Sequence, residues 1–277
     1  MPKKIIFMGT PMFAVPILKS LYQNGFPINL VYTQPPQKSH RGQKINKSPV
    51  QGISETLNIE FRSPQNLKNN TEEYEFLKKM DADLAIVVAY GQIIPKEFLS
   101  LTKKGFINIH ASILPKWRGA APIQRAIMNL DTETGISIMK INEELDSGPV
   151  SNTYKIKLDQ SLNAKEISEK LALMAADKIL DVVDEIFEGK SNFVDQDSSK
   201  ATYAKKITKN EGQIDWKSDA LKIIGKINCL YPSPGAFFNF NGQRYKILKA
   251  EIGNGIGKNG EVISDNLEIA CGGEKSI

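Results

Sequence analysis

Two polar side chains that could act on a carbonyl group lie two residues apart at the end of an apolar stretch. Asn108 and His110 alternate with Ile107 and Ile109, so on a β-strand the polar pair faces one side and the isoleucines face the other. An amide can donate a hydrogen bond to a developing oxyanion, and an imidazole can donate one or move a proton. The pair therefore predicts a site that polarises a carbonyl.

A third polar residue, Asp146, follows another predicted strand at 135–141, within an acidic turn closed by glycine and proline. If the two strands are parallel, they end at the same edge of the sheet, so we expect Asp146 to lie near Asn108 and His110. The trio suits acyl-type transfer to an amine, with Asp146 carrying or relaying the proton. No serine or cysteine nucleophile accompanies the histidine, which favours direct transfer. Because a histidine after a strand is more often structural, spacing alone leaves both interpretations open.

The order of the predicted elements favours an α/β fold. Strand patterns alternate with helical spacing, which predicts a Rossmann-like, mostly parallel sheet with helices on both faces. The nearly all-apolar run 83–91 is typical of a central strand buried on both faces. The first strand is followed by one glycine instead of G-x-G-x-x-G, which argues against a tightly held dinucleotide. The other predicted strands are 4–8, 28–33, 59–61, 105–110 and 150–156, and the helices are 13–22, 50–57, 72–80, 122–129 and 164–188.

After the long helix 164–188, from Lys190 on, the sequence becomes polar and basic and loses its apolar periodicity. We predict a catalytic domain at 1–189, a basic linker at 190–208 and a small OB-like β-barrel domain at 209–277. In the last region, a helix is predicted at 220–230, and Asn-Gly at 241–242 between apolar-rich runs predicts a hairpin. We expect this barrel to be truncated, because the sequence stops where another strand would begin.

The whole chain has ordinary composition, with 277 residues, 41% hydrophobic residues, 24% charged residues and a net charge of +5. No apolar run reaches the length of a membrane span, and no signal segment precedes the first strand. We therefore expect a cytoplasmic protein without membrane contact, and a monomer. Cys229 and Cys271 are expected to be reduced core thiols. The two histidines and two cysteines show no metal-ligand spacing, so no metal is expected.

Two stretches concentrate positive charge without an intervening acid. The first is the segment 34–49, which we predict to be a long polar loop and which carries Lys38, Arg41, Lys44 and Lys47. The second stretch carries Lys200, Lys205, Lys206 and Lys209. Such stretches suit a phosphate backbone, although two solvated lysine-rich loops are an equally simple explanation. His40 is expected to be a loop residue.

Several motifs resemble the 10-formyltetrahydrofolate-dependent formyltransferases. Residues 108–115, Asn-Ile-His-Ala-Ser-Ile-Leu-Pro, are similar to the family's Asn-x-His…Ser-Leu-Leu-Pro motif, with Ile113 in place of the usual leucine. Leu-Asp-Ser-Gly at 145–148 resembles its Leu-Asp-x-Gly motif. The runs 7–13, 87–95 and 116–125 are similar to the branch that acts on methionyl-initiator tRNA. The resemblance spans nearly the whole chain.

The resemblance implies an activity and a set of site residues. The activity is transfer of the formyl group of 10-formyltetrahydrofolate, a co-substrate, to the amino group of methionyl-initiator tRNA for translation initiation. The catalytic positions match Asn108, His110 and Asp146. The folate-binding region, where backbone groups take the pterin, matches Val88, Tyr90, Gly91, Ile93, Pro95, Ser112, Ile113, Leu114 and Pro115. The tRNA-contacting positions match Lys38, Arg41, Lys44, Lys47, Lys205, Lys206 and Lys209, with Arg41 at the key arginine.

Two other classes of function remain to be weighed. One is a formyltransferase for a different amine, such as an amino-sugar nucleotide or glycinamide ribonucleotide. These relatives typically lack the Trp-Arg-Gly-Ala-Ala-Pro-Ile-Gln run found at 117–124. The other is a non-catalytic RNA-binding protein, which would need the basic stretches but would have no use for Asn108, His110 and Asp146 together.

Overall fold

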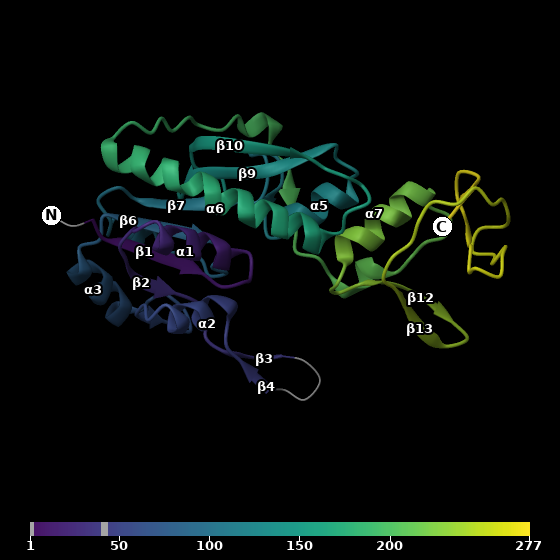
Figure 1. Ribbon diagram of the computed structural model, residues 1–277, viewed down its shortest axis with the longest axis horizontal. Coiled ribbons are helices and arrows are strands. Elements are labelled where there is room, and N and C mark those ends of the chain that lie inside the picture. The colour runs from purple at the N-terminus through teal and green to yellow at the C-terminus, as the bar shows by residue number, and fades with distance from the viewer. Residues whose placement is uncertain (1–2, 40–43) are drawn as a thin grey trace. The chain divides into compact units, whose positions relative to one another are not determined.

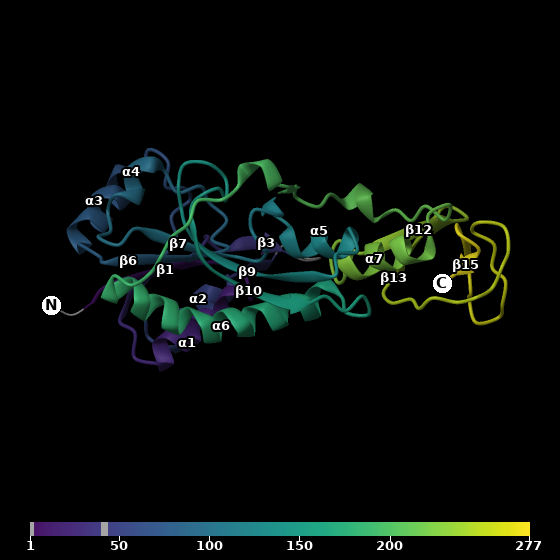
Figure 2. The same cartoon turned by 90° about the horizontal axis from the view of Figure 1, so that it is seen from above.

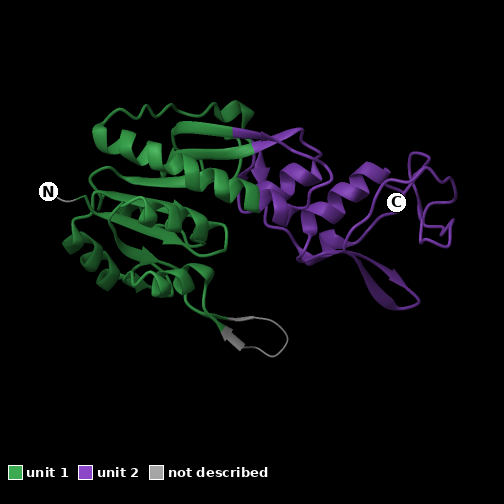
Figure 3. Cartoon of the chain, in the orientation of Figure 1, with its two compact units in different colours: residues 1–116, 135–154, 169–201 green, residues 117–134, 155–168, 202–277 purple. Residues whose placement is uncertain are grey.

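A computed structural model describes residues 3–39 and 44–277 of the chain. The chain divides into two compact units, each built from three separate stretches (Figure 3). Unit 1 comprises residues 1–116, 135–154 and 169–201, and unit 2 comprises 117–134, 155–168 and 202–277. The predicted linker 190–208 is therefore shared between the units, and the proposed domain boundaries stay predictions.

A seven-stranded sheet in the order β10-β9-β7-β6-β1-β2-β5 organises unit 1 (Figure 1). The pairs β1–β2, β1–β6, β6–β7 and β2–β5 are parallel, which confirms the mostly parallel sheet. β9, however, is antiparallel to β7, so the parallel arrangement expected for the strand at 135–141 was wrong. The strands are β1 (Ile5–Gly9), β2 (Ile28–Tyr32), β5 (Phe61–Arg62), β6 (Leu84–Val88), β7 (Phe106–His110), β9 (Glu133–Lys140) and β10 (Val150–Lys157).

Helices cover both faces of this sheet, as predicted (Figure 2). On one face lie α1 (Ala14–Gln23) and α6 (Ala164–Glu188), which are tied by a hydrogen bond from Ser20 Oγ to the Ala176 carbonyl at 2.6 Å. α2 (Pro49–Thr56) packs beside α1. On the other face, α3 (Thr71–Met80) and α4 (Lys96–Leu99) close a buried cluster with the strands. Because both faces are covered, every residue of β1 and β6 is buried.

The candidate site lies on the face that α3 and α4 cover. Phe106, at the start of β7, belongs to the same buried cluster as Leu77 of α3 and Phe98 of α4. Because side chains alternate along a strand, Asn108 and His110 share the face of Phe106. The predicted separation of this polar pair from its neighbouring isoleucines is thus present in β7.

Two local features of unit 1 were not predicted. Within the polar loop 34–49, β3 (Gln37–Ser39) and β4 (Lys44–Asn46) pair antiparallel. His40 and Arg41 lie outside the described residues. The helix α4 was not predicted, since four residues are too few to show helical periodicity.

Unit 2 is organised by two helices and short strand pairs. α5 (Pro122–Met128) packs on α7 (Ala220–Leu230). β12 (Ala236–Phe240) and β13 (Gln243–Ile247) form the predicted hairpin around Asn241 and Gly242, which both have positive φ. Cys229 and Cys271 are buried free thiols. The remaining elements are β8 (Arg118–Gly119), β11 (Tyr203–Ala204), β14 (Ala270–Cys271), β15 (Lys275–Ser276) and the 3₁₀ turns η1 (Ser198–Lys200, in unit 1) and η2 (Lys209–Gly212).

The C-terminal region is less regular than predicted. Strands were expected at 261–263 and 267–271, but only a single bridge, between Val262 and Ile269, and the short β14 are present there. Within the described part of the chain, the strands after residue 209 form two separate two-stranded sheets. A closed barrel stays a prediction. Across the residues that the structure describes, no helix is both long and apolar enough to span a membrane.

A buried ion pair stabilises the sheet where β2 and β5 end. The Arg62 guanidinium donates to both carboxylate oxygens of Glu73, and the Tyr32 hydroxyl donates to Glu73 at 2.6 Å. Only 7% of the Glu73 side chain and 25% of Arg62 are exposed. Burial, reinforced by the hydrogen bond to Glu73, raises the pKa of Tyr32 above its usual range. The Glu73 carboxylate therefore accepts hydrogen bonds from two partly or fully buried groups, the Arg62 guanidinium and the Tyr32 hydroxyl.

Replacing Glu73 by alanine should lower the free energy of unfolding by about 3–5 kcal/mol, because it leaves the Arg62 charge without its buried partner. Chemical denaturation of the variant measures this loss. Glu72→Ala is the matched control, since Glu72 contacts the same arginine at 3.3 Å but is 86% exposed. Its effect should stay below about 1 kcal/mol. Equal effects of the two substitutions would contradict the role of the buried pair.

Candidate active site

Asn108, His110 and Asp146 meet in unit 1. Asn108 Nδ2 donates to Asp146 Oδ1 at 3.4 Å, at the long end of the hydrogen-bond range. His110 Nδ1 lies 3.6 Å from Asp146 Oδ2. The side chains of His110 and Asp146 are only 7% and 15% exposed. The cluster thus places an amide donor, a buried imidazole and a carboxylate with little solvent exposure close together, the combination needed to stabilise an oxyanion and accept a proton.

Asp146 reaches the pair by a route that the sequence did not predict. In the antiparallel pairing, Lys140 at the end of β9 lies opposite Ile107, near the start of β7. The chain must then fold back to bring Asp146 beside His110. Gly148 makes this return possible, because a Cβ there would collide with the Lys140 carbonyl oxygen. Asp146 itself has a positive φ of 48°, a conformation that is uncommon for a residue other than glycine.

A residue from the predicted linker holds this return loop. Gln196 Nε2 donates to the carbonyl oxygens of Asp146 at 2.9 Å and Gly148 at 2.7 Å. The segment around Gln196 is itself paired, through a bridge between Val194 and Val150 at the start of β10. The first half of the predicted linker is therefore part of the site's support. The sequence carried no signal for this role, because the stretch is polar and lacks periodicity.

Ser137 fixes the predicted cofactor segment 112–115. Its hydroxyl donates to the Ser112 carbonyl at 2.8 Å and accepts from the Leu114 N–H at 3.1 Å. The Ser112 hydroxyl in turn donates to the Lys116 carbonyl at 2.6 Å. Ser137 was not among the predicted site residues. A serine between isoleucines in the mostly apolar run 135–141 is nevertheless a sequence signal that could have identified it, and the structure buries it fully.

The second predicted cofactor segment follows β6. The Tyr90 side chain is buried, and the Tyr90 carbonyl accepts from Thr10 Oγ1 at 2.7 Å. The Gly91 carbonyl accepts from Gln34 Nε2 at 2.7 Å. Ile93 points outward, with 90% of the residue exposed. Val88 ends the strand and Pro95 precedes α4, so the segment connects two rigid elements.

The predicted RNA-contacting lysines have different surroundings. Lys47 lies in a stretch without acidic residues, but it pairs with Glu55, which follows that stretch, at 2.9 Å. Lys200 likewise pairs with Asp197 at 2.9 Å. Lys205, Lys206 and Lys209 are exposed on unit 2. Lys38 and Lys44 belong to β3 and β4, whereas Arg41 lies outside the described residues.

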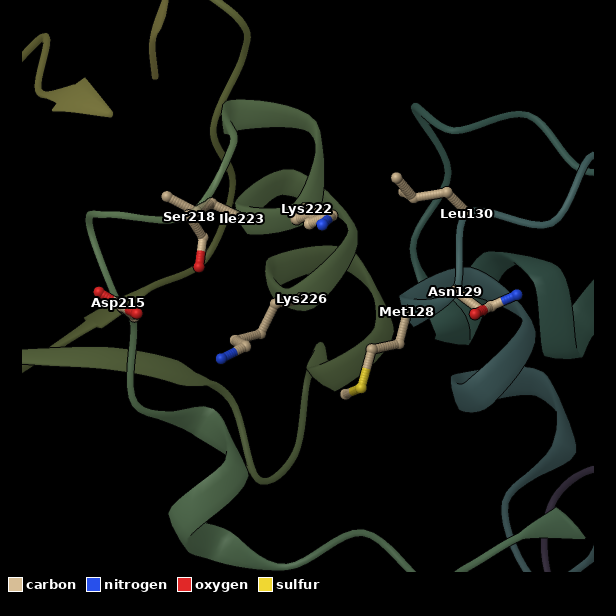
Figure 4. Close-up of a pocket in the computed structure, with 8 residues that line it drawn as sticks. All are labelled: Met128, Asn129, Leu130, Asp215, Ser218, Lys222, Ile223 and Lys226. Carbon is tan, nitrogen blue, oxygen red and sulfur yellow. The ribbon is translucent and has the colours of Figure 1, made fainter. Parts of the chain in front are cut away.

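A separate cavity of about 290 Å³ lies within unit 2, lined by α7 and the end of α5 (Figure 4). Lys222, Lys226 and Asp215 contribute to its wall. Lys226 Nζ donates to the Gln213 carbonyl at 3.0 Å, so we assign no ligand to this cavity.

Among residues 3–39 and 44–277, no group of three or more histidine, cysteine, aspartate or glutamate side chains could hold a metal ion.

Comparison with known proteins identifies the family. The formyl transferase family is matched over residues 3–183, and the formyl transferase C-terminal domain is matched over residues 206–277. The chain belongs to the formyl transferase family. The methionyl-tRNA formyltransferase of Pelagibacter ubique is 66% identical over 277 residues, covering all of this chain and 89% of that protein. The methionyl-tRNA formyltransferase of a Chelativorans strain is 41% identical, covering 98% of this chain and 89% of its own.

Solved structures share the formyl transferase fold at lower identity. WlaRD, a sugar 3N-formyl transferase crystallised in the presence of dTDP and 5-N-formyl-THF, has a TM-score of 0.76 at 18% identity, covering 100% of this chain and 96% of its own. HypX from Aquifex aeolicus in complex with tetrahydrofolic acid has a TM-score of 0.66 at 17% identity, covering 100% of this chain and 44% of its own. These likenesses support the architecture of this formyl transferase.

Proposed function

We propose that this formyl transferase moves the formyl group of 10-formyltetrahydrofolate to the free amino group of methionyl-initiator tRNA. The observation that carries the proposal is the 66% identity, over the full chain, to an enzyme named methionyl-tRNA formyltransferase. The convergence of Asn108, His110 and Asp146 supplies the chemistry that such a transfer needs. The proposed role is in translation initiation.

The three residues divide the work of the transfer. When bound, 10-formyltetrahydrofolate supplies a formyl group on a nitrogen that can leave. Asn108 donates a hydrogen bond to the formyl oxygen, where negative charge develops as the amine attacks the carbonyl carbon. His110 donates to the same oxygen or moves a proton. As the amine nitrogen bonds to the formyl carbon and the bond from that carbon to the folate nitrogen breaks, Asp146 accepts the proton that the attacking nitrogen loses and returns it to the folate nitrogen.

The folate is proposed to bind along residues 88–95 and 112–115. Two proteins of the same fold, crystallised with 5-N-formyl-THF and with tetrahydrofolic acid, support a folate as the ligand, and the positions of these segments rest on the sequence resemblance. The Ser137 hydroxyl already occupies the Leu114 N–H, so we expect the pterin to use other backbone groups of these segments. The exposed apolar side chain of Ile93 offers a contact for a flat ring.

The strongest alternative is a sugar N-formyltransferase, because structures of that class share the fold over the full chain. Their identity to this chain is only 17–18%, which is why we prefer the tRNA. Incubation with 10-formyltetrahydrofolate and one of several amines decides between them. The amines are methionyl-initiator tRNA, elongator methionyl-tRNA, an amino-sugar nucleotide and glycinamide ribonucleotide. We expect formylation of the initiator tRNA, and formylation of a small amine alone would overturn the proposal.

Asp146→Asn and His110→Ala should each lower turnover by at least about 10², the scale of general acid–base contributions. Binding of methionyl-tRNA, measured by filter retention, should remain nearly unchanged because the altered groups act on the reacting atoms. Wild-type turnover in Asp146→Asn would show that this carboxylate does not handle the proton.

Arg41→Ala should weaken the use of tRNA while sparing the folate. The loss of one phosphate contact should reduce the slope of log K against log salt by about one. The KM for tRNA at several salt concentrations measures this, with the KM for the folate as internal reference. Lys19→Ala, which removes an exposed cation on α1, is the control and should change neither constant. An unchanged salt slope in Arg41→Ala would argue against a contact with the RNA.

A further inference from the structure

We propose that the Arg125–Glu211 ion pair braces residues 205–211, and thereby holds Lys205, Lys206 and Lys209 in the conformation that contacts tRNA. The inference concerns unit 2 alone, and its RNA part rests on the proposed function. Arg125 and Glu211 are here positioning residues, since neither needs to touch the RNA.

The pair ties α5 to both ends of this segment. Arg125 Nη1 lies 2.6 Å from Glu211 Oε2. The same guanidinium donates through Nε and Nη2 to the Lys205 carbonyl at 3.1 and 2.9 Å. The planar Arg125 guanidinium, on α5, thus contacts both the first residue of the segment, Lys205, and the last, Glu211.

Glu211 also closes the segment from within. Its Oε1 accepts from the Thr208 N–H at 2.8 Å, which is one half of the capping box of η2, and also accepts from the Thr208 hydroxyl at 3.1 Å. The hydrogen bond from Arg125 is the largest cause that lowers the pKa of Glu211 to about 2. Glu211 is therefore ionised at neutral pH. The pair is only 17% and 31% exposed, so water screens it less than it would a pair on an open surface.

Residues 202–204 are anchored immediately upstream. β11 pairs in parallel with β8, with the Arg118 N–H donating to the Thr202 carbonyl at 2.8 Å and the Ala120 N–H donating to the Ala204 carbonyl at 2.9 Å. Gly119 has a φ of 117°, and a Cβ there would press on the Ala204 carbonyl oxygen. Residues 118–120 thus hold the chain immediately before the basic segment in place.

The consequence for binding follows from preorganisation. Lys205, Lys206 and Lys209 are exposed, so they can reach a phosphate backbone without rearrangement. A segment ordered before binding avoids part of the conformational entropy that binding would otherwise remove. The brace should therefore act on the affinity for tRNA and leave the chemical step unchanged.

Two conservative substitutions test the brace. Arg125→Lys keeps the charge but removes the fork to Lys205, and Glu211→Gln keeps an acceptor for Thr208 but removes the charge. Each should raise the KM for tRNA roughly three- to tenfold, because binding must then order the segment. The kcat and the KM for the folate should not change. Glu133→Gln is the matched control, because it breaks an exposed pair of the same unit, Glu133–Lys155.

Limited trypsin digestion tests, in the absence of RNA, whether the Arg125–Glu211 pair orders residues 205–211. Cleavage after Lys205, Lys206 and Lys209 should accelerate in both variants and stay at the wild-type rate in Glu133→Gln. Unchanged cleavage would overturn the brace. Faster cleavage with an unchanged KM for tRNA would overturn its role in binding. If the wild-type enzyme formylates no tRNA, the proposed function fails instead, and the digestion still decides whether the pair orders the segment.

A different observation carries a second inference: we infer that Gln196 is a positioning residue for Asp146. Its two hydrogen bonds reach the carbonyls on either side of Ser147, at Asp146 and Gly148. Residues 142–145 of the loop are exposed, so burial does little to hold it. Asp146 also keeps a positive φ that needs support from its surroundings. Gln196 supplies that support from a distant part of the chain.

Gln196→Met and Gln196→Glu remove the donor with little change of size. Both should lower kcat roughly tenfold or more without raising the KM for tRNA, and should move the pH profile of kcat because the Asp146 carboxylate shifts against His110. Asp195→Asn, an adjacent exposed residue, is the control. Amide hydrogen exchange of residues 142–149 should accelerate in the two Gln196 variants. Unchanged exchange, or a kcat within twofold of wild type, would overturn the inference, and the exchange result does not depend on the substrate.

Discussion

The antiparallel pairing of β9 with β7 is the constraint from which the site's other features follow. Because of this pairing, β9 ends opposite Ile107, near the start of β7. The catalytic arrangement, however, needs a carboxylate beside His110, at the other end of β7. A sharp return loop is therefore required, which explains the close approach of Gly148 to the Lys140 carbonyl and the left-handed backbone of Asp146. A loop with that geometry and little burial needs an external hydrogen-bond donor. Gln196 provides it.

Long, periodic elements were predictable from the sequence. The helices at 164–188 and 220–230 were predicted with the bounds that the structure has, because several turns of apolar spacing leave little ambiguity. The sheet was predicted as mostly parallel, yet the direction of β9 was missed. The reason is physical: the burial pattern of a strand records which faces are covered and carries no record of the direction of its neighbour.

The candidate site was predictable where residue type carried the information. Asn108, His110 and Asp146 are polar residues in apolar or turn contexts, and the structure places side-chain atoms of Asn108 and His110 3.4 and 3.6 Å from the Asp146 carboxylate. Support residues were not predictable in the same way. Gln196 lies in the predicted linker and Glu211 near the start of the predicted C-terminal domain, and the residues they hold, Asp146 and Arg125, are far away in sequence. Charge was similarly misjudged, because Glu55 and Asp197 lie just beyond the stretches that contain Lys47 and Lys200.

The interleaving of the two units has a consequence for dissecting this molecule. The chain passes between the units five times before it ends in unit 2. A fragment cut after the long helix α6 would keep β8 and α5 but discard β11 and α7, the elements that cover them. Such a fragment would expose an unpaired strand edge and an apolar helix face, both of which promote association. The two halves are therefore better studied by point substitution in the whole chain than by truncation.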